Sequence, residues 1–408
     1  MGGGLARFDT IGLHGIWSWI SSSNQHHIVE FIRRHLKPGG VVYNSYNCFP
    51  GWAPNAPLRE LLALYDQFVG GNETDTAKRV GNALKFAGDL LAAKPAYAML
   101  VPSLNAKLEQ LKGMDRNYLA HEYFNRAWQC PYFVDVVEAL SAAKLDYACT
   151  MELLDMSDQL NLTADAQKFL NAIGNPIMRE QARDYFVGRQ FRKDLCIKGL
   201  RRLSTLERVK RLLETRFVLT TVNKIPMKFP TALGEATLPA QTFEPMIEYL
   251  AADGYRPKTF EEPIRQGRLN VPALENMLIP FVHQGYILPC QSEDVIEQVK
   301  PQCDALNDYI CRRARTSFNV QYLASPVTGM GMTVGKLEQL FVSLIKSGSS
   351  SVEELARGVW QMFLVSSERM IRDGKMLPTE QENLVELRAL AQKFSETMLP
   401  TLRALQIV

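Results

Sequence analysis

Long apolar runs are absent from this sequence. A membrane-spanning helix needs about 18 or more consecutive apolar residues, and the most apolar N-terminal stretch, residues 11–20, is interrupted by His14 and Ser18. Asp9 precedes that stretch, which is atypical of a signal peptide. We therefore expect no membrane insertion and a cytoplasmic protein.

Paired cysteines and clustered metal ligands are also missing. The seven cysteines are scattered, and none forms the C-x-x-C spacing of a structural zinc site or a thioredoxin-like motif. His121 and Glu122 lack the second histidine of a zincin. His26, His27 and Glu30 have possible ligand spacing on a helix, but no third ligand group is apparent. We expect no bound metal and a reducing compartment.

A strong charge of either sign is missing as well. The formal net charge is only +3, which does not by itself indicate nucleic acid. Residues 183–216 are locally basic, and we interpret them as the solvated face of amphipathic helices rather than an RNA site. The glycine-rich stretch 329–336 has Met330 where a P-loop requires glycine. We expect neither a phosphate loop nor a nucleic-acid partner.

The N-terminal segment does carry a clear pattern. Phe8–Leu13 is a short apolar run typical of a buried strand, residues 25–36 have helical apolar spacing, and residues 41–45 form a second apolar run. The Pro and Gly residues at 38–40 separate the helix from the second strand. This order predicts a βαβ unit with two parallel strands.

Further elements follow by the same rules. Helices are expected over residues 56–113, a strand over 118–124, a helix over 133–144, a strand over 145–150 and helices over 156–214. Next come extended stretches at 217–222 and 228–238, helices at 241–253, 258–265 and 271–285, and a strand at 286–289. Three short helices before a strand suggest a winged-helix-like module. Long helices are expected at 334–347, 351–373 and 379–398.

Several motifs together resemble one family. They are FDTIGLHGIWSW at residues 8–19, LKPGGVVYNSYN at 36–47, PGW at 50–52 and DYFVGRQFRKD at 184–194. This combination resembles the class I methyltransferases that use S-adenosyl-L-methionine (SAM) and carry a methyltransferase regulatory domain. Under this resemblance, Phe8–Leu13 and residues 41–45 are strands four and five of the methyltransferase sheet, residues 118–124 are strand six, and 145–154 are strand seven.

The resemblance implies an α/β fold combined with mostly α regions. Residues 1–155 would be the C-terminal half of a Rossmann-like methyltransferase sheet, with a helical insertion at about 56–113. Residues 156–216 would be a helical regulatory region, and residues 217–408 a winged-helix-like and helical domain. The family holds SAM mainly through strands one and two, whereas this sequence begins at strand four. Met1 to Gly4 are glycine-rich, but no strand precedes them and no helix follows. We therefore expect the chain to be truncated and incomplete for SAM binding.

The candidate site lies at the carboxyl ends of strands four and five, where open parallel sheets bind ligands. His14 is a candidate base, and Tyr46 could orient an amine through its hydroxyl. His14 and Gly15 could contact SAM, while Trp17, Trp19 and Asn47 could contact the methyl acceptor. The opposing interpretation is that His14 and the tryptophans serve only packing.

Two functions remain open. The first is a SAM-dependent methyltransferase acting on a protein, because some relatives with this regulatory region methylate protein lysines. The second is a non-catalytic regulatory or protein-interaction remnant of such an enzyme. With strands one to three missing, Phe8–Leu13 would be an edge strand, so we expect residues 1–50 to be poorly ordered, to aggregate or to pair with another chain.

Overall fold

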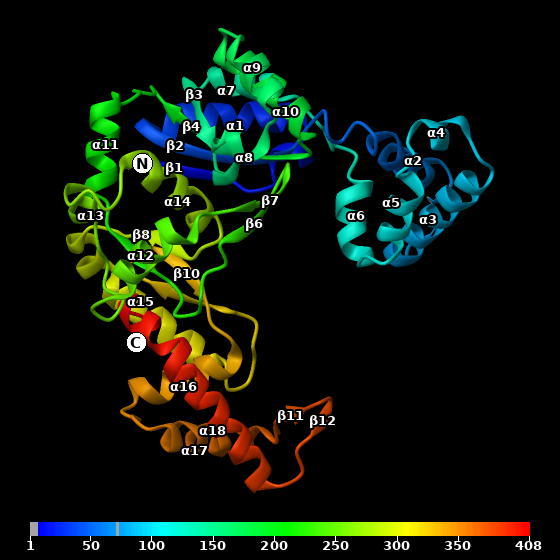
Figure 1. The fold of residues 1–408 in the computed structure, drawn as a ribbon. Coiled ribbons are helices and arrows are strands. Elements are labelled where there is room, and N and C mark those ends of the chain that lie inside the picture. Colours follow the sequence, from blue (N-terminus) through cyan, green and yellow to red (C-terminus); the bar gives the residue numbers. More distant parts are fainter. Residues whose placement is uncertain (1–6, 71–72) are drawn as a thin grey trace, which may run out of the picture. The chain divides into compact units, whose positions relative to one another are not determined.

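The computed structural model describes residues 7–70 and 73–408. The glycine run at 1–4 lies outside the described residues. The chain forms two compact units (Figure 1), one ending at Arg202 and also containing Thr231–Leu233, the other made of Leu203–Pro230 and Gly234–Val408. No helix in the described part of the chain is long and apolar enough to cross a bilayer. The three-domain division with boundaries at 155 and 216 stays a prediction.

The first unit is built on a four-stranded sheet in the order β1-β2-β4-β3. Its strands are β1 (Phe8–Leu13), β2 (Leu36–Asn47), β3 (Leu145–Thr150) and β4 (Phe191–Lys198). β1 and β2 are parallel, and helix α1 (Ser22–His35) connects them, which confirms the predicted βαβ unit. β4 lies antiparallel to both β2 and β3.

β4 corrects the sequence analysis, which expected helix at these residues. Its buried side chains include Arg192 and Asp194. Charged residues usually lie at the surface, so in the sequence these two positions look like the exposed face of a helix. β4 also corrects the numbering that the resemblance gave. Counting from strand four at β1, the strand at Leu145–Thr150 is the sixth, and the seventh is β4.

One face of the sheet is covered by α1 and α7 (Phe133–Ser141). Val29 and Ile32 of α1, with Val136 and Leu140 of α7, pack against Val42 of β2 in one apolar cluster. β1 lies at the edge of the sheet, and within the described residues it pairs with β2 alone. This confirms its expected edge position, while the association of residues 1–50 stays a prediction.

A helical lobe follows β2 and forms its own apolar core. It contains α2 (Ala56–Phe68), α3 (Thr76–Ala92), α4 (Ala96–Leu100), α5 (Leu104–Lys112) and α6 (Arg116–Phe124) (Figure 1). The α6 helix overturns the strand expected at 118–124. The Asp115 carboxylate caps it by accepting from the Tyr118 amide at 2.9 Å, and Leu119 and Tyr123, one turn apart, enter the core of the lobe.

Short helices connect β3 to β4. They are a 3₁₀ turn (Leu153–Met156), α8 (Asp158–Asn161), α9 (Ala164–Asn171) and α10 (Pro176–Val187). Gly188 ends α10 in the left-handed conformation, at a φ of 60°, and the chain then enters β4.

The second unit begins with α11 (Thr205–Glu214) and a small α/β group. Its elements are β5 (Phe217–Leu219), β6 (Lys228–Thr231), β7 (Gly234–Thr237), α12 (Ala240–Ala251), α13 (Glu261–Arg265), α14 (Val271–His283) and β8 (Ile287–Pro289). β5 and β8 pair antiparallel around an apolar core. Three helices do precede a strand, and the winged-helix interpretation stays a prediction.

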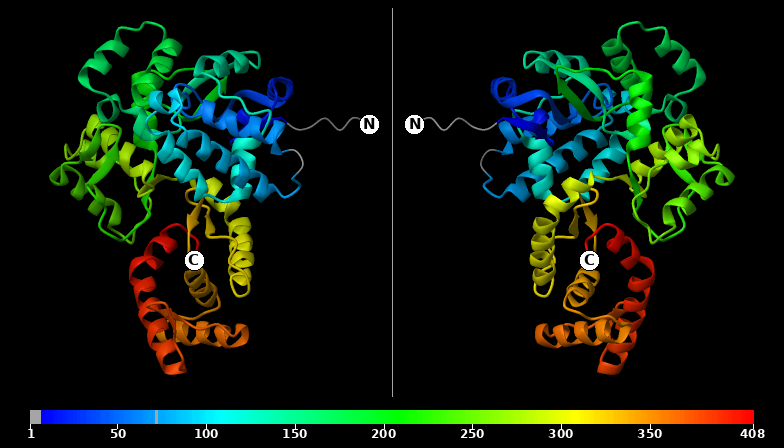
Figure 2. Two further views of the ribbon diagram at one scale, coloured as in Figure 1. Left: turned by 90° about the vertical axis from the view of Figure 1, so that its right-hand side faces the viewer. Right: turned by 90° about the vertical axis from the view of Figure 1, so that its left-hand side faces the viewer.

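The C-terminal part is mostly helical (Figure 2). It contains α15 (Glu293–Arg313), β9 (Tyr322–Ser325), β10 (Met330–Thr333), α16 (Lys336–Lys346), α17 (Val352–Ser366), β11 (Ile371–Arg372), β12 (Lys375–Met376), α18 (Glu380–Thr397) and α19 (Leu399–Ala404). α15 was not expected, and the helix expected over 351–373 ends at Ser366, because Ser367 adopts a φ of 56°. The glycine-rich stretch begins as β10 of a hairpin.

Candidate active site

The carboxyl ends of β1 and β2 meet at one edge of the sheet because the two strands are parallel. Leu13 lies opposite Asn44, so the residues after Leu13 lie beside the last residues of β2. This places His14, Gly15 and Asn47 in one neighbourhood, as the sequence predicted. Open parallel sheets bind ligands at this edge.

His14 is exposed at the end of β1. Its Nδ1 lies 3.3 Å from the Tyr43 hydroxyl, and the two rings stack with their centroids 6.0 Å apart. The hydrogen bond fixes the ring through one nitrogen, and Nε2 is the ring nitrogen left for another group.

Gly15 turns the chain away from the sheet. Its φ is +65°, a conformation that L side chains rarely adopt. Its amide donates to the Ser45 hydroxyl at 2.8 Å, which ties the turn to β2. Apart from its two chain neighbours, no heavy atom of the described residues lies within 4 Å of a Cβ built at this glycine, which leaves space beside its backbone.

Ser18 joins the two strand ends from inside. Its hydroxyl accepts from the Asn47 amide at 2.8 Å and donates to the Asn47 carbonyl at 3.4 Å. Neighbouring Trp17 is 2% exposed and packs in the core of the sheet. The Trp17 side chain therefore packs inside the sheet and does not face a methyl acceptor.

Four of the five tryptophans gather at this edge. The ring centroids of Trp19 and of His121 on α6 are 5.0 Å apart, and those of Trp52 and Trp128 are 5.3 Å apart. The Trp52 indole donates to the Asn47 side-chain oxygen at 3.2 Å. An aromatic layer of partly exposed rings thus joins the strand ends to the helical lobe.

Sequence reasoning missed the contribution of the lobe. Arg59 of α2 is 2% exposed, its guanidinium lies 4.7 Å from the Trp128 ring centroid, and it donates to the Asn125 carbonyl. Burial lowers the pKa of Arg59. The Asn125 side chain in turn donates to the Trp19 carbonyl at 3.1 Å. A usable signal was the placement of Trp52 only five residues after Asn47.

Tyr46 is fully buried, and its hydroxyl donates to Asp194 at 2.7 Å. Burial, with the nearby Asp194 charge, raises the pKa of Tyr46 well above its usual value. The hydroxyl is thus held inside the sheet, away from an acceptor, and belongs to a buried set that we call the Arg192 network: Tyr46, Glu180, Asp184, Arg192 and Asp194.

Arg192 is the centre of this network. Its guanidinium donates to Asp194 at 2.9 Å, Asp184 at 2.6 Å and Glu180 at 3.0 Å. Burial raises the pKa of Asp184 to about 6, against the lowering effect of Arg192. The network fastens β2 and β4 to α10.

Metal-ligating groups do not cluster anywhere in the described residues. The Glu30 carboxylate forms ion pairs with Arg33 at 2.9 Å and with Arg34 at 3.5 Å. The groups that the strand ends present are the His14 ring, the Tyr43 hydroxyl and the backbone of Gly15.

The chain is similar to several known proteins. The family described as a predicted methyltransferase regulatory domain matches residues 115–198, from the cap of α6 to the end of β4. The uncharacterised protein sll1526 of Synechocystis is 36% identical over 405 residues, which cover 99% of this chain and 78% of that protein. The chain belongs to the methyltransferase family that carries this regulatory domain.

Other similar proteins come from Rickettsia. The uncharacterised protein RP028 of Rickettsia prowazekii is 29% identical over 133 residues, covering 32% of this chain and 52% of that protein. The structure of PKMT2 from Rickettsia typhi in complex with AdoHcy superposes with a TM-score of 0.65 at 17% identity, covering 98% of this chain and 81% of that chain. At that identity the likeness establishes a shared fold.

Proposed function

We propose that this chain is a SAM-dependent methyltransferase that methylates lysine side chains of a protein. Family membership supports the reaction class. The observation that carries the proposal for this chain is the carboxyl end of β1, where the exposed His14 ring stands beside the open backbone of Gly15.

The residues at this edge fit one side of SAM. The space around Gly15 allows close approach of a ligand, and the bond from its amide to Ser45 keeps the turn in place. SAM supplies an electrophilic methyl group on a sulfonium sulfur. We assign His14 and Gly15 to the side of SAM that faces the acceptor.

His14 would act on the acceptor as a base. A lysine ammonium must lose a proton before its nitrogen can attack a methyl group. In the tautomer whose Nδ1–H donates to the Tyr43 oxygen, Nε2 is free to accept that proton. The Trp19 ring could hold the ammonium by a cation–π contact before the proton leaves, with Asn47 at the same edge. We assign Tyr46 a structural role, because its hydroxyl joins β2 to Asp194 of β4.

The test is methyl transfer from radiolabelled SAM to a lysine-rich protein, together with isothermal titration of the full chain with SAM. We expect His14→Ala to lower kcat about a hundredfold, as expected for loss of a general base. Tyr43→Phe should lower kcat and leave SAM affinity unchanged, because it removes the hydrogen bond that orients the His14 ring. His27→Ala, an exposed histidine on α1, serves as the matched control. Unchanged kcat in His14→Ala would remove the assigned base.

A non-catalytic regulatory chain is the second candidate. It is favoured by the internal roles of Trp17 and Tyr46, two predicted site residues whose side chains serve packing and the Arg192 network. A folded chain that neither binds SAM nor transfers methyl groups would favour this candidate.

A further inference from the structure

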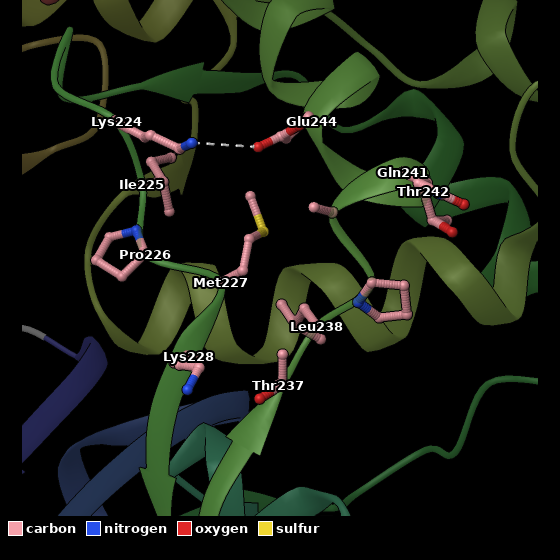
Figure 3. A pocket seen from close by; sticks show the side chains of 12 residues that line it. Lys224, Ile225, Pro226, Met227, Lys228, Thr237, Leu238, Gln241, Thr242 and Glu244 are labelled. Atoms are coloured by element: carbon pink, nitrogen blue, oxygen red, sulfur yellow. Dashed lines mark ion pairs between the residues drawn. The ribbon is translucent and has the colours of Figure 1, made fainter.

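A groove runs along α12 in the second unit (Figure 3). We call it the α12 groove. It consists of a cavity of about 840 Å³ between the irregular segment that leads into β6 and the start of α12, and an adjoining one of about 310 Å³ further along the helix. The two cavities share Lys224, Ile225, Met227 and Glu244. They follow one another along α12, because Gln241 and Thr242 line the first and Ile247 and Glu248 line the second.

The floor of the groove is apolar. Figure 3 shows the Met227 side chain projecting into the cavity above Leu238. Ile225 is buried beneath the groove, while Met227 and Leu238 are half-buried. The Leu238 amide donates to the Met227 carbonyl at 2.7 Å, which fixes the backbone of the floor. A methionine wall adapts its shape to different apolar partners.

The rim carries charges that are incompletely balanced. Lys228 pairs with Glu235 at 2.9 Å, whereas Lys224 and Glu244 approach only to 3.7 Å across the groove. Glu248 is exposed one turn after Glu244 and has no ion-pair or hydrogen-bond partner for its carboxylate in the described part of the chain. The open groove therefore has a surplus negative charge on its α12 side.

We propose that the α12 groove binds an extended, basic segment of a substrate protein. One apolar side chain of the segment would enter between Met227 and Leu238, and a lysine or arginine would pair with Glu248. Glu244 and Glu248 are neighbours on one helix face, with Cβ atoms about 5–6 Å apart. Alternate residues of an extended segment are separated by about 6–7 Å and point the same way, so a Lys-x-Lys sequence matches both carboxylates. The choice of a lysine-containing protein rests on the proposed function.

The test is fluorescence anisotropy of the full chain with the labelled peptide Gly-Leu-Gly-Lys-Gly-Lys-Gly, without SAM. Two control peptides replace either both lysines by glutamate or the leucine by serine. We expect the parent peptide to bind best and its binding to weaken with added salt. Equal binding of all three peptides would overturn the proposal.

Variants of the chain locate the binding. Met227→Ser should weaken binding about tenfold, because it removes the apolar contact with the side chain of the peptide leucine; a tenfold change corresponds to about 1.4 kcal/mol. Glu248→Gln should weaken binding about threefold, the size expected of an exposed ion pair, and its exposed position keeps the test independent of folding. Glu297→Gln on α15, also exposed, is the matched control. If neither Met227→Ser nor Glu248→Gln changes binding, the groove is not the site.

The same measurements separate this proposal from the proposed function. Peptide binding without any methyl transfer would contradict the methyltransferase activity and support the groove. Methyl transfer that is unaffected in Glu248→Gln and Met227→Ser, with no peptide binding, would contradict the groove alone. Self-association that is abolished by Met227→Ser in sedimentation would assign the groove to a second copy and overturn the proposal.

Discussion

At the strand ends of the sheet, polar groups bind one another. The Ser18 hydroxyl accepts a hydrogen bond from the Asn47 amide, and the Ser45 hydroxyl accepts one from the Gly15 amide. Arg192 forms ion pairs with three carboxylates. In the α12 groove, by contrast, the walls are apolar, the one ion pair across it is loose, and Glu248 is unpaired in the described part of the chain. The difference teaches where each part can tolerate change: the sheet has little freedom to adapt, whereas the groove can accept varied partners.

The largest expected effect comes from removing the centre of the Arg192 network. Arg192→Leu should lower the free energy of unfolding by about 3–5 kcal/mol, because it leaves buried carboxylates without their counter-charge. Urea unfolding measures the change. Arg202→Ala, at an exposed arginine of the same unit, is the control, and a loss equal to that of the control would show that the network adds nothing.

The pH dependence of stability is the next effect. Burial raises the pKa of Asp184 to about 6, against about 3.9 for an unfolded aspartate. Between these values the folded chain binds a proton that the unfolded chain has lost, so this contribution to stability is present below about pH 4 and is lost as the pH rises to about 6. The difference of about two pKa units corresponds to about 3 kcal/mol.

Asp184→Asn isolates that contribution. The variant should lose this part of the pH dependence when its free energy of unfolding is compared with that of the parent chain between pH 4 and 7. An identical pH profile in the two proteins would contradict a raised pKa for Asp184.

A smaller effect is expected where the strand ends are joined. Ser18→Ala removes the partner of the buried Asn47 amide, and an unsatisfied buried group costs about 1–3 kcal/mol. Hydrogen exchange should accelerate at Asn47. Ser23→Ala, exposed on α1, should leave both stability and exchange unchanged; protection of Asn47 that survives Ser18→Ala would count against the proposed link.

The smallest effect is expected in the α12 groove. Glu244→Gln breaks only the loose contact with Lys224, so its free energy of unfolding should stay within about 0.5 kcal/mol of the parent value. Thermal unfolding provides the check. A large loss of stability would mean that the groove is as tightly organised as the sheet, and the contrast between the two regions would fail.

The sequence predicted the elements whose apolar spacing has one interpretation. β1, α1 and β2 were recognised from apolar runs separated by Pro and Gly, and the positions of His14, Gly15 and Asn47 followed from parallel pairing. Residues 118–124 fit two patterns, because Leu119 and Tyr123 suit an alternating strand as well as one face of a helix.

The rest could not be derived because it depends on distant partners. β4 was missed since Arg192 and Asp194 neutralise each other only once the strand is buried. The roles of Arg59 and Trp128 depend on how the helical lobe packs, and Tyr46 looked available because its partner is 148 residues away.

Asn125 links the helical lobe to the candidate site. The Asn125 side chain donates a hydrogen bond to the Trp19 carbonyl, and the Asn125 carbonyl accepts one from Arg59 of the lobe. One residue therefore connects the lobe to the loop that begins at His14. Removal of the Asn125 side-chain amide would break the bond to the Trp19 carbonyl, whereas the bonds from Gly15 to Ser45 and from Asn47 to Ser18 would still hold that loop.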